Sequence, residues 1–347
     1  MKTLGLYFFI IIALSSCMKE DNAITLPAPG PVKQGTANMG VNYDNQVYCN
    51  LETGTAIVRP YKSYDLAFEA SESGLHIYLN SAKFMFACNT QTYDLASADT
   101  VGHPWALDCE QLIEDTLALT KYWQDINFSS QGSKVFAIDR GKLEHTGTAR
   151  WRKFKVLSGD SLKYTICFSN YDNSSLDTVE VVKDDNYSLM YFSFDAPNQL
   201  VQQAPPKDQW DFVFTKYTHV FFEYNVTSPF RYYFVTGVVQ NIWNNTAVMR
   251  FQKDSMPFDS ITGLPVPYLP IEQFNYSQVS NFKFSSNANA IGYNWKYYNF
   301  SDAYYHIYPD LYFVVKSNNG FYYTVKMVDF YDTAGNKGLV TFQSQRI

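Results

Sequence analysis

The sequence has little of what enzymes and metal proteins usually need. It holds five His and five Cys in 347 residues, and no Cys pair has the spacing of a zinc ribbon. It contains no glycine-rich phosphate loop, no His-Glu-x-x-His helix and no nucleophile elbow. We therefore expect a protein that is not an enzyme.

Positive charge and long apolar runs are also scarce. The net charge of −6 gives no support for binding to nucleic acid or to acidic lipid. Past the amino terminus, no apolar run is long enough to cross a bilayer, and helical patterns are few. The scarcity of helical patterns favours a β protein.

The amino terminus has the features of a lipoprotein signal. An apolar run over residues 4–14 is too short to span a membrane but suits a signal-peptide core. Residues 1–16 are thus predicted to be the signal, and Cys17 is predicted to carry the lipid that anchors the chain to a membrane. An ordinary secretory signal with an incidental Cys is the alternative.

Residues 17–40 are predicted to be a flexible tether, since they are poor in apolar residues. Directly after Cys17 comes a Lys followed by two acidic residues, which resembles the surface-export signal of lipoproteins. A solvated charge cluster would look the same. The expected location is the outer membrane, at the cell surface.

Aromatic residues are abundant instead, at 18% of the chain with 28 Tyr and 27 Phe. Such residues favour strands. The motif WDFVF at 210–214 has a less aromatic copy, YDLAF, at 64–68. In both copies, large apolar residues at every second position predict one apolar strand face.

The strands around this motif are repeated in the same order. VYCNL at 47–51 corresponds to MYFSF at 190–194, and WRKFKV at 151–156 corresponds to YYTVKM at 322–327. Three ordered matches indicate a duplicated β unit with loops of different length. Aromatic strands that are alike only in composition are the simpler alternative.

We therefore predict an all-β fold of two tandem antiparallel β units, at 41–172 and 187–347, with one or two short helices. The polar stretch 170–186 is the predicted boundary. Residues 107–117 have the spacing of one short amphipathic helix. Residues 252–290, rich in Pro, predict a lid, a binding loop or a disordered insertion.

Two chemical modifications are suggested by short patterns. Four Cys follow Cys17, and disulfides and buried free thiols are equally open for Cys49, Cys88, Cys109 and Cys167. The triplet Asp-Ser/Thr-apolar occurs seven times, starting at Asp99, Asp115, Asp160, Asp177, Asp254, Asp259 and Asp332. It resembles an O-glycosylation site of exported bacterial proteins.

The second unit resembles the HmuY family. The resemblance is carried by residues 191–194, by the motif at 210–214, and by the closing strands at 312–315, 325–331 and 337–342. It implies an all-β, lipid-anchored surface protein that binds haem and passes it to an outer-membrane importer. The first half resembles the family more distantly, through Tyr48, Asp65, Phe68 and Lys155.

The chain departs from the family at the haem ligands. The best-known members hold the iron between two His, but residues 226–305 here contain no His. Substitute ligands are therefore sought among His306, Met256, Tyr298 and His219, since Met and Tyr also ligate haem iron. On base rates a Met or Tyr in so aromatic a chain is more often packing than ligand.

Two functions follow from these observations. The first is capture of haem or a similar flat ligand for uptake. The second is an HmuY-like scaffold without haem, which binds glycan, peptide or another envelope protein.

Overall fold

The computed structural model describes residues 28–112, 114–119, 122, 130–196, 200–221, 232–253 and 268–347. It confirms the all-β class, because the described sheets are antiparallel throughout and the helical elements given bounds are short 3-10 turns. No helix in this part of the chain is long and apolar enough to cross a membrane.

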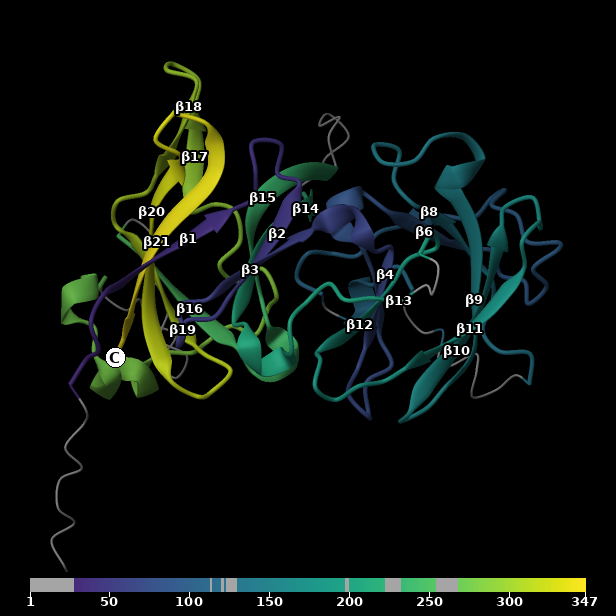
Figure 1. Ribbon diagram of the computed structural model, residues 1–347, viewed down its shortest axis with the longest axis horizontal. Helices are drawn as coiled ribbons and strands as arrows, with labels where there is room; N and C mark the ends of the chain where they lie inside the picture. The colour runs from purple at the N-terminus through teal and green to yellow at the C-terminus, as the bar shows by residue number, and fades with distance from the viewer. Residues whose placement is uncertain are drawn as a thin grey trace, which may run out of the picture.

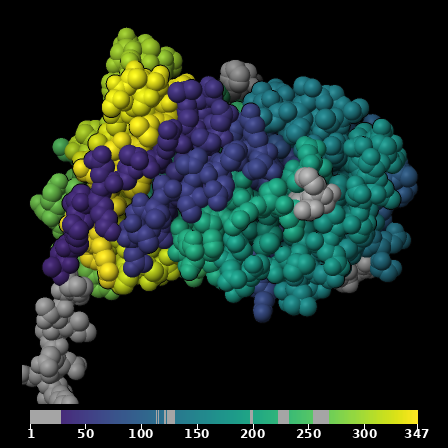
Figure 2. All heavy atoms as spheres, in the orientation of Figure 1, coloured from purple at the N-terminus to yellow at the C-terminus, as the bar shows by residue number. Residues whose placement is uncertain are grey.

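Two lobes lie side by side (Figure 1). The insert lobe is built from the consecutive strands β4 to β13. The terminal lobe is built from β1 to β3 together with β14 to β21, so it contains the first and last strands of the chain. Figure 2 shows the purple N-terminal residues lying across the yellow C-terminal ones.

The terminal lobe is a sandwich of two sheets. Its five-stranded sheet has the order β1 (Lys33–Asn38), β21 (Lys337–Arg346), β20 (Tyr322–Tyr331), β19 (Leu311–Lys316) and β16 (Ala247–Gln252). Its four-stranded sheet has the order β3 (Ala56–Pro60), β2 (Asn45–Cys49), β14 (Phe212–Val220) and β15 (Tyr232–Gln240). Side chains of both sheets, including Phe212, Phe214 and Phe342, fill the core between them.

The insert lobe has the same plan. One sheet has the order β11 (Asp177–Val182), β10 (Lys163–Asn170), β9 (Trp151–Gly159), β8 (Phe136–Asp139), β6 (Phe86–Asn89) and β7 (Trp105–Ala106). The other has the order β13 (Leu200–Val201), β12 (Leu189–Phe192), β4 (Leu66–Glu69) and β5 (Ile77–Leu79). Phe68, Phe154 and Phe192 lie in its core.

Short elements complete the fold. A two-stranded hairpin, β17 (Lys296–Asn299) and β18 (Tyr304–Ile307), projects from the terminal lobe (Figure 1). The 3-10 turns are η1 (Tyr61–Ser63), η2 (Ser81–Lys83), η3 (Glu114–Thr116), η4 (Gly147–Arg150), η5 (Lys207–Gln209), η6 (Ile242–Asn244), η7 (Ile271–Gln273) and η8 (Tyr276–Asn281). Among the described residues of the range 107–117, only η3 is helical, and it is a 3-10 turn, so the α-helix predicted there is wrong.

The two four-stranded sheets are built in the same way. Tyr48 of β2 lies opposite Val213 of β14, and Tyr191 of β12 lies opposite Ala67 of β4. These pairs join residues at corresponding places in the two copies of the repeat. Each sheet therefore takes two strands from each half of the chain, which agrees with two β units.

The chain passes from one lobe to the other at places other than the predicted boundary. The stretch 170–186 contains β11, while the chain leaves the terminal lobe after β3 and returns before β14. The limits 41–172 and 187–347 thus remain a prediction about the sequence repeat. They are not the limits of the two lobes.

A third cluster lies between the lobes. It joins the second faces of the two four-stranded sheets, with Tyr48 and Val213 from one and Ala67 and Tyr191 from the other. Both faces of these strands are therefore buried. Trp210 lies in this cluster, with its ring 5.1 Å from that of Tyr48.

The prediction that Trp210 shares a face with Phe212 and Phe214 is wrong. Trp210 follows directly after η5, and strand β14 begins only at Phe212. The alternation of a strand does not yet apply at position 210, so the indole packs between the lobes while Phe212 and Phe214 enter the core of the terminal lobe.

Candidate functional site

His219 on β14 is held by a buried carboxylate. Its Nδ1 lies 2.6 Å from Oε1 of Glu110, whose side chain is 2% exposed, while the imidazole is 18% exposed. An ionised carboxylate only accepts hydrogen bonds, so Nδ1 of a neutral His219 carries the proton. The lone pair of such an imidazole then resides on Nε2.

Glu110 is itself fixed by the loop that carries it. Its Oε2 accepts a hydrogen bond from the backbone N–H of Val220 at 3.2 Å. Two residues earlier, Asp108 accepts the backbone N–H groups of Leu79 at 2.6 Å and Ala118 at 2.8 Å. Burial raises the pKa of Asp108 to about 7, against the effect of these two hydrogen bonds.

Aromatic rings flank His219. The ring of Phe221 lies 4.7 Å from the imidazole and that of Tyr293 lies 4.8 Å from it. Phe221 is 38% exposed. The imidazole therefore sits at a partly open, apolar position at the end of β14.

Two other predicted ligands lie on the β17–β18 hairpin. His306 is 42% exposed, with Nε2 at 2.7 Å from Oδ2 of Asp302, and its ring stacks on Tyr297. Tyr298 is 40% exposed and packs against Phe300 and Tyr305. Among the described residues, no hydrogen bond or ring contact joins His219 to His306 or Tyr298.

Met256 lies outside the described residues, as does Cys17. The other four Cys are free and buried, so the open choice between thiols and disulfides is decided for thiols. In the described part of the chain, no group of three His, Cys, Asp or Glu side chains is arranged to hold a metal ion.

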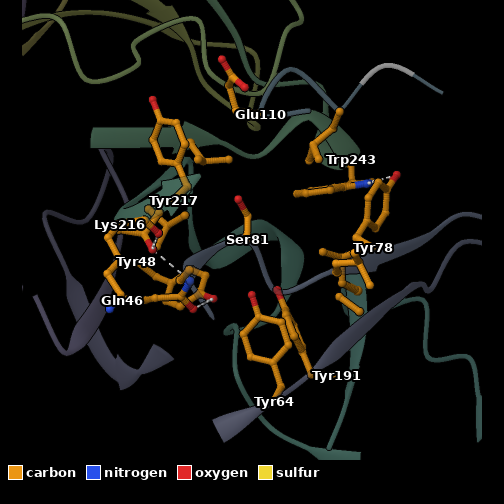
Figure 3. A pocket seen from close by; sticks show the side chains of 18 of the residues that line it. Gln46, Tyr48, Tyr64, Tyr78, Ser81, Glu110, Tyr191, Lys216, Tyr217 and Trp243 are labelled. Carbon is orange, nitrogen blue, oxygen red and sulfur yellow. Dashed lines mark hydrogen bonds between the residues drawn. The ribbon is translucent and has the colours of Figure 1, made fainter. Parts of the chain in front are cut away.

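A cavity of about 100 Å³ lies behind Glu110, between the two four-stranded sheets. Figure 3 shows Glu110 and Tyr217 at one end, Tyr64 and Tyr191 at the other, and Ser81 between them. The aromatic residues that line it are Tyr48, Tyr64, Tyr78, Tyr191, Trp210, Tyr217 and Trp243. Each lobe contributes part of the wall.

Sequence reasoning did not find this cavity or the role of Glu110. Glu110 looked like one polar residue of a short helix. Tyr48 and Tyr191 were visible only as corresponding residues of the repeat. That correspondence was the available signal, since equivalent strands of two β units can meet across one interface.

The family comparison agrees with the strand motifs. The model of the HmuY protein family matches residues 185–343. The predicted resemblance to the HmuY family is therefore confirmed over this segment. This HmuY segment includes β12 and β13, which pair within the insert lobe, and it lacks β1 to β3, which complete the sheets of the terminal lobe.

Solved structures similar to the whole chain share little sequence with it. Apo PinO from Porphyromonas gingivitis is 12% identical, with a TM-score of 0.31, and the match covers 91% of this chain and 97% of that one. The apo HmuY analog of Tannerella forsythia is 12% identical, with a TM-score of 0.30 and coverage of 92% and 98%.

A third structure, named as an HmuY-like heme binding protein from Bacteroides vulgatus, is 15% identical. Its TM-score is 0.21, and the match covers 56% of this chain and 90% of that one. No curated protein matches the chain.

Proposed function

We propose that the protein is a surface lipoprotein of HmuY type that binds haem, or a similar flat ligand, through Nε2 of His219. The observation that carries the proposal is the 2.6 Å contact between Nδ1 of His219 and buried Glu110. Metal-ligating His residues almost always donate their other N–H group to such a partner, which fixes the tautomer and raises the basicity of the ligating nitrogen.

The residues around His219 suit a porphyrin. Haem supplies four nitrogen ligands to its own iron, so the protein needs to add only one or two donors. A cluster of several protein ligands is therefore not required. Phe221 and Tyr293 would give apolar cover to the porphyrin face. The cavity behind Glu110 is too small for a porphyrin, so the ligand would lie on the exposed side of His219.

A second iron ligand is proposed among the other predicted residues. His306 has its Nε2 occupied by Asp302, which leaves Nδ1 as the possible donor. Met256 and Tyr298 are the further candidates. The proposed role is binding, with transfer to an outer-membrane importer, and no described feature favours the alternative of a scaffold without haem.

The proposed lipid on Cys17 agrees with the shape of the molecule. Gly30 donates its N–H to the carbonyl of Arg346 at 2.8 Å, so the described chain begins beside its C-terminal end. In Figure 1 this end lies opposite the β17–β18 hairpin. A tether to the membrane would leave the hairpin pointing away from it.

Absorbance titration with haemin tests the haem proposal. We expect a Soret band with one haem per chain in the parent protein. His219→Ala should shift this band and weaken haem binding, and Glu110→Gln should weaken it about 10- to 100-fold because the ligating nitrogen becomes less basic. His103→Ala, at a loop His more than a hundred positions before His219 in the chain, is the matched control.

The same titration identifies the second ligand, through His306→Ala, Tyr298→Phe and Met256→Ala. Absence of any spectral change at micromolar haemin would remove the haem proposal. An unchanged band in His219→Ala would show that His219 is not a ligand.

A further inference from the structure

Two residues that line the cavity between the lobes carry buried hydrogen-bond donors without partners. Among the described residues, the hydroxyl group of Tyr217 and Nε1 of Trp210 are buried and lack a hydrogen bond. Tyr217 is 3% exposed and Trp210 is 1% exposed, and both line the cavity. A buried polar group left unpaired costs roughly 1–3 kcal/mol, so a native structure rarely keeps two of them at one place without reason.

Three polar groups that line the cavity already accept hydrogen bonds from the protein itself. Oε1 of Gln46 accepts from the hydroxyl of Tyr48 at 3.2 Å and from Nε2 of Gln203 at 2.7 Å. The hydroxyl oxygen of Ser81 accepts from the backbone N–H of Thr218 at 2.9 Å. The carboxylate of Glu110 accepts hydrogen bonds from Nδ1 of His219 and from the backbone N–H of Val220, as described above.

A bound molecule would therefore have to bring its own acceptor. Indole Nε1 is a donor only, and a tyrosine hydroxyl remains a donor as long as it is protonated. Burial raises the pKa of Tyr217 well above its ordinary value, and the nearby charge of Glu110 raises it further. An anionic ligand is disfavoured by the same carboxylate.

The size and walls of the cavity restrict the ligand further. Its volume is about 100 Å³. An engineered apolar cavity of about 150 Å³ in another protein holds benzene, so this smaller cavity restricts the ligand to a single small ring. The walls are largely aromatic, which favours a flat or ring-shaped apolar body.

We propose that the cavity between the two four-stranded sheets is a second binding site, for a small uncharged ring molecule that carries an oxygen acceptor. The acceptor receives the hydroxyl of Tyr217 or the indole N–H of Trp210, and the ring packs against the aromatic walls. This site is separate from the proposed haem surface, because His219, Phe221 and Tyr293 are not among the residues that line the cavity. It does not depend on haem binding.

Calorimetric titration of the protein with phenol and with benzene tests the site. The two probes have the same ring, and only phenol has an oxygen. We expect one phenol per chain, bound at least about 10-fold more tightly than benzene, since one hydrogen bond of about 1.4 kcal/mol corresponds to that factor. Tyr217→Phe or Trp210→Phe should remove most of the preference for phenol while leaving benzene binding in place.

Two controls make the result specific. Tyr233→Phe makes the same chemical change at a residue of β15 that is 61% exposed and does not line the cavity, and it should leave phenol binding unchanged. His219→Ala should also leave it unchanged.

Three outcomes would overturn the proposal. The first is failure of both probes to bind, which would mean that the cavity holds only water. The second is a phenol preference that survives both cavity variants. The third is loss of phenol binding in His219→Ala, which would place phenol at the haem surface instead.

Discussion

Lys296 is a buried amine in aromatic surroundings. It is 7% exposed, and its Nζ donates to the carbonyl of Thr236 at 2.6 Å and lies 4.1 Å from the ring centre of Trp295 and 4.7 Å from that of Phe330. Burial lowers the pKa of Lys296 to about 7. The folded protein therefore resists the charged form of this side chain.

This pKa predicts a pH dependence of stability. Below pH 7, Lys296 is charged in both the folded and the unfolded chain, so the folded state bears the full cost of burying the charge. Between about pH 7 and about pH 10.4, only the unfolded chain keeps the proton. The free energy of unfolding should thus rise with pH in this window, by up to about 1.4 kcal/mol per pH unit from this residue.

Urea unfolding of the parent and of Lys296→Met, between about pH 7 and about pH 8.5, measures this contribution. The unfolded thiols, whose ordinary pKa is about 8.5, ionise alike in both proteins and therefore cancel from the comparison. The parent should show the steeper rise, and Lys33→Met, at an exposed position of β1, should follow the parent. Equal slopes for the parent and Lys296→Met would contradict the lowered pKa.

At the scale of elements, two equivalent aspartates hold the corners before β4 and β14. The backbone N–H of Asp65 donates to the carbonyl of Phe192, and that of Asp211 donates to the carbonyl of Cys49. Their carboxylates accept the equivalent backbone N–H groups of Phe194 at 2.9 Å and Leu51 at 2.7 Å. The same corner is therefore built twice.

The remaining partners of the two carboxylates differ. Asp65 contacts Nζ of Lys83 at 2.5 Å and Nη2 of Arg140 at 3.0 Å, and all three side chains are buried. Burial alone would raise the pKa of Asp65, but these two cations outweigh it and hold the pKa below its ordinary value. Asp211 accepts instead from the hydroxyl of Ser317 at 2.6 Å, and burial raises its pKa.

We expect Asp65→Ala to cost about 3–5 kcal/mol at neutral pH, because it leaves the buried Lys83 without its carboxylate partner and Arg140 with the exposed Asp195 alone. The carboxylate of Asp65 stabilises the fold above its unfolded pKa and loses this effect as pH falls through the lower folded pKa. The cost of Asp65→Ala should therefore shrink in acid.

Asp211→Ala is the matched variant, and its cost in stability should change with pH in the opposite direction. A raised pKa means that the folded state binds the proton more tightly, so Asp211 contributes more to stability as pH falls. The cost of Asp211→Ala should then grow in acid. Denaturant unfolding of both variants from pH 7 downward measures the two trends, and parallel trends would refute the different electrostatics of the corners.

At the scale of the whole molecule, the insert lobe is joined to the terminal lobe through a shared aromatic cluster. Both chain crossings lie beside this cluster, and Trp210 is its largest buried side chain. Removal of a buried Trp side chain costs about 3–5 kcal/mol. We expect the parent protein to unfold in one calorimetric transition, because neither lobe can open without exposing this shared face.

Trp210→Ala should lower the stability and split unfolding into two transitions, since it removes the largest buried side chain of the cluster that joins the lobes. Trp105→Ala, on β7 at the edge of the insert lobe, should leave a single transition. Two separate transitions in the parent protein would show that the lobes unfold independently.

Sequence alone determined the local properties of this protein. Alternating aromatic residues predicted β2, β4, β9, β12, β14 and β20, because a strand needs only its own side chains to define two faces. The ordered repeats predicted two β units, and the strand motifs of the second half predicted the HmuY family. These signals lie within short stretches of chain, where the spacing of residues in the sequence is enough to identify them.

Only the tertiary structure decided which strands pair and what meets between them. Local spacing cannot tell that β2 pairs with β14 and β12 with β4, because each pairing joins residues more than a hundred positions apart. The contact of His219 with Glu110 and the cavity between the lobes depend on these distant pairings. Trp210, predicted to share a strand face with Phe212 and Phe214, lies between the lobes because β14 begins only after it.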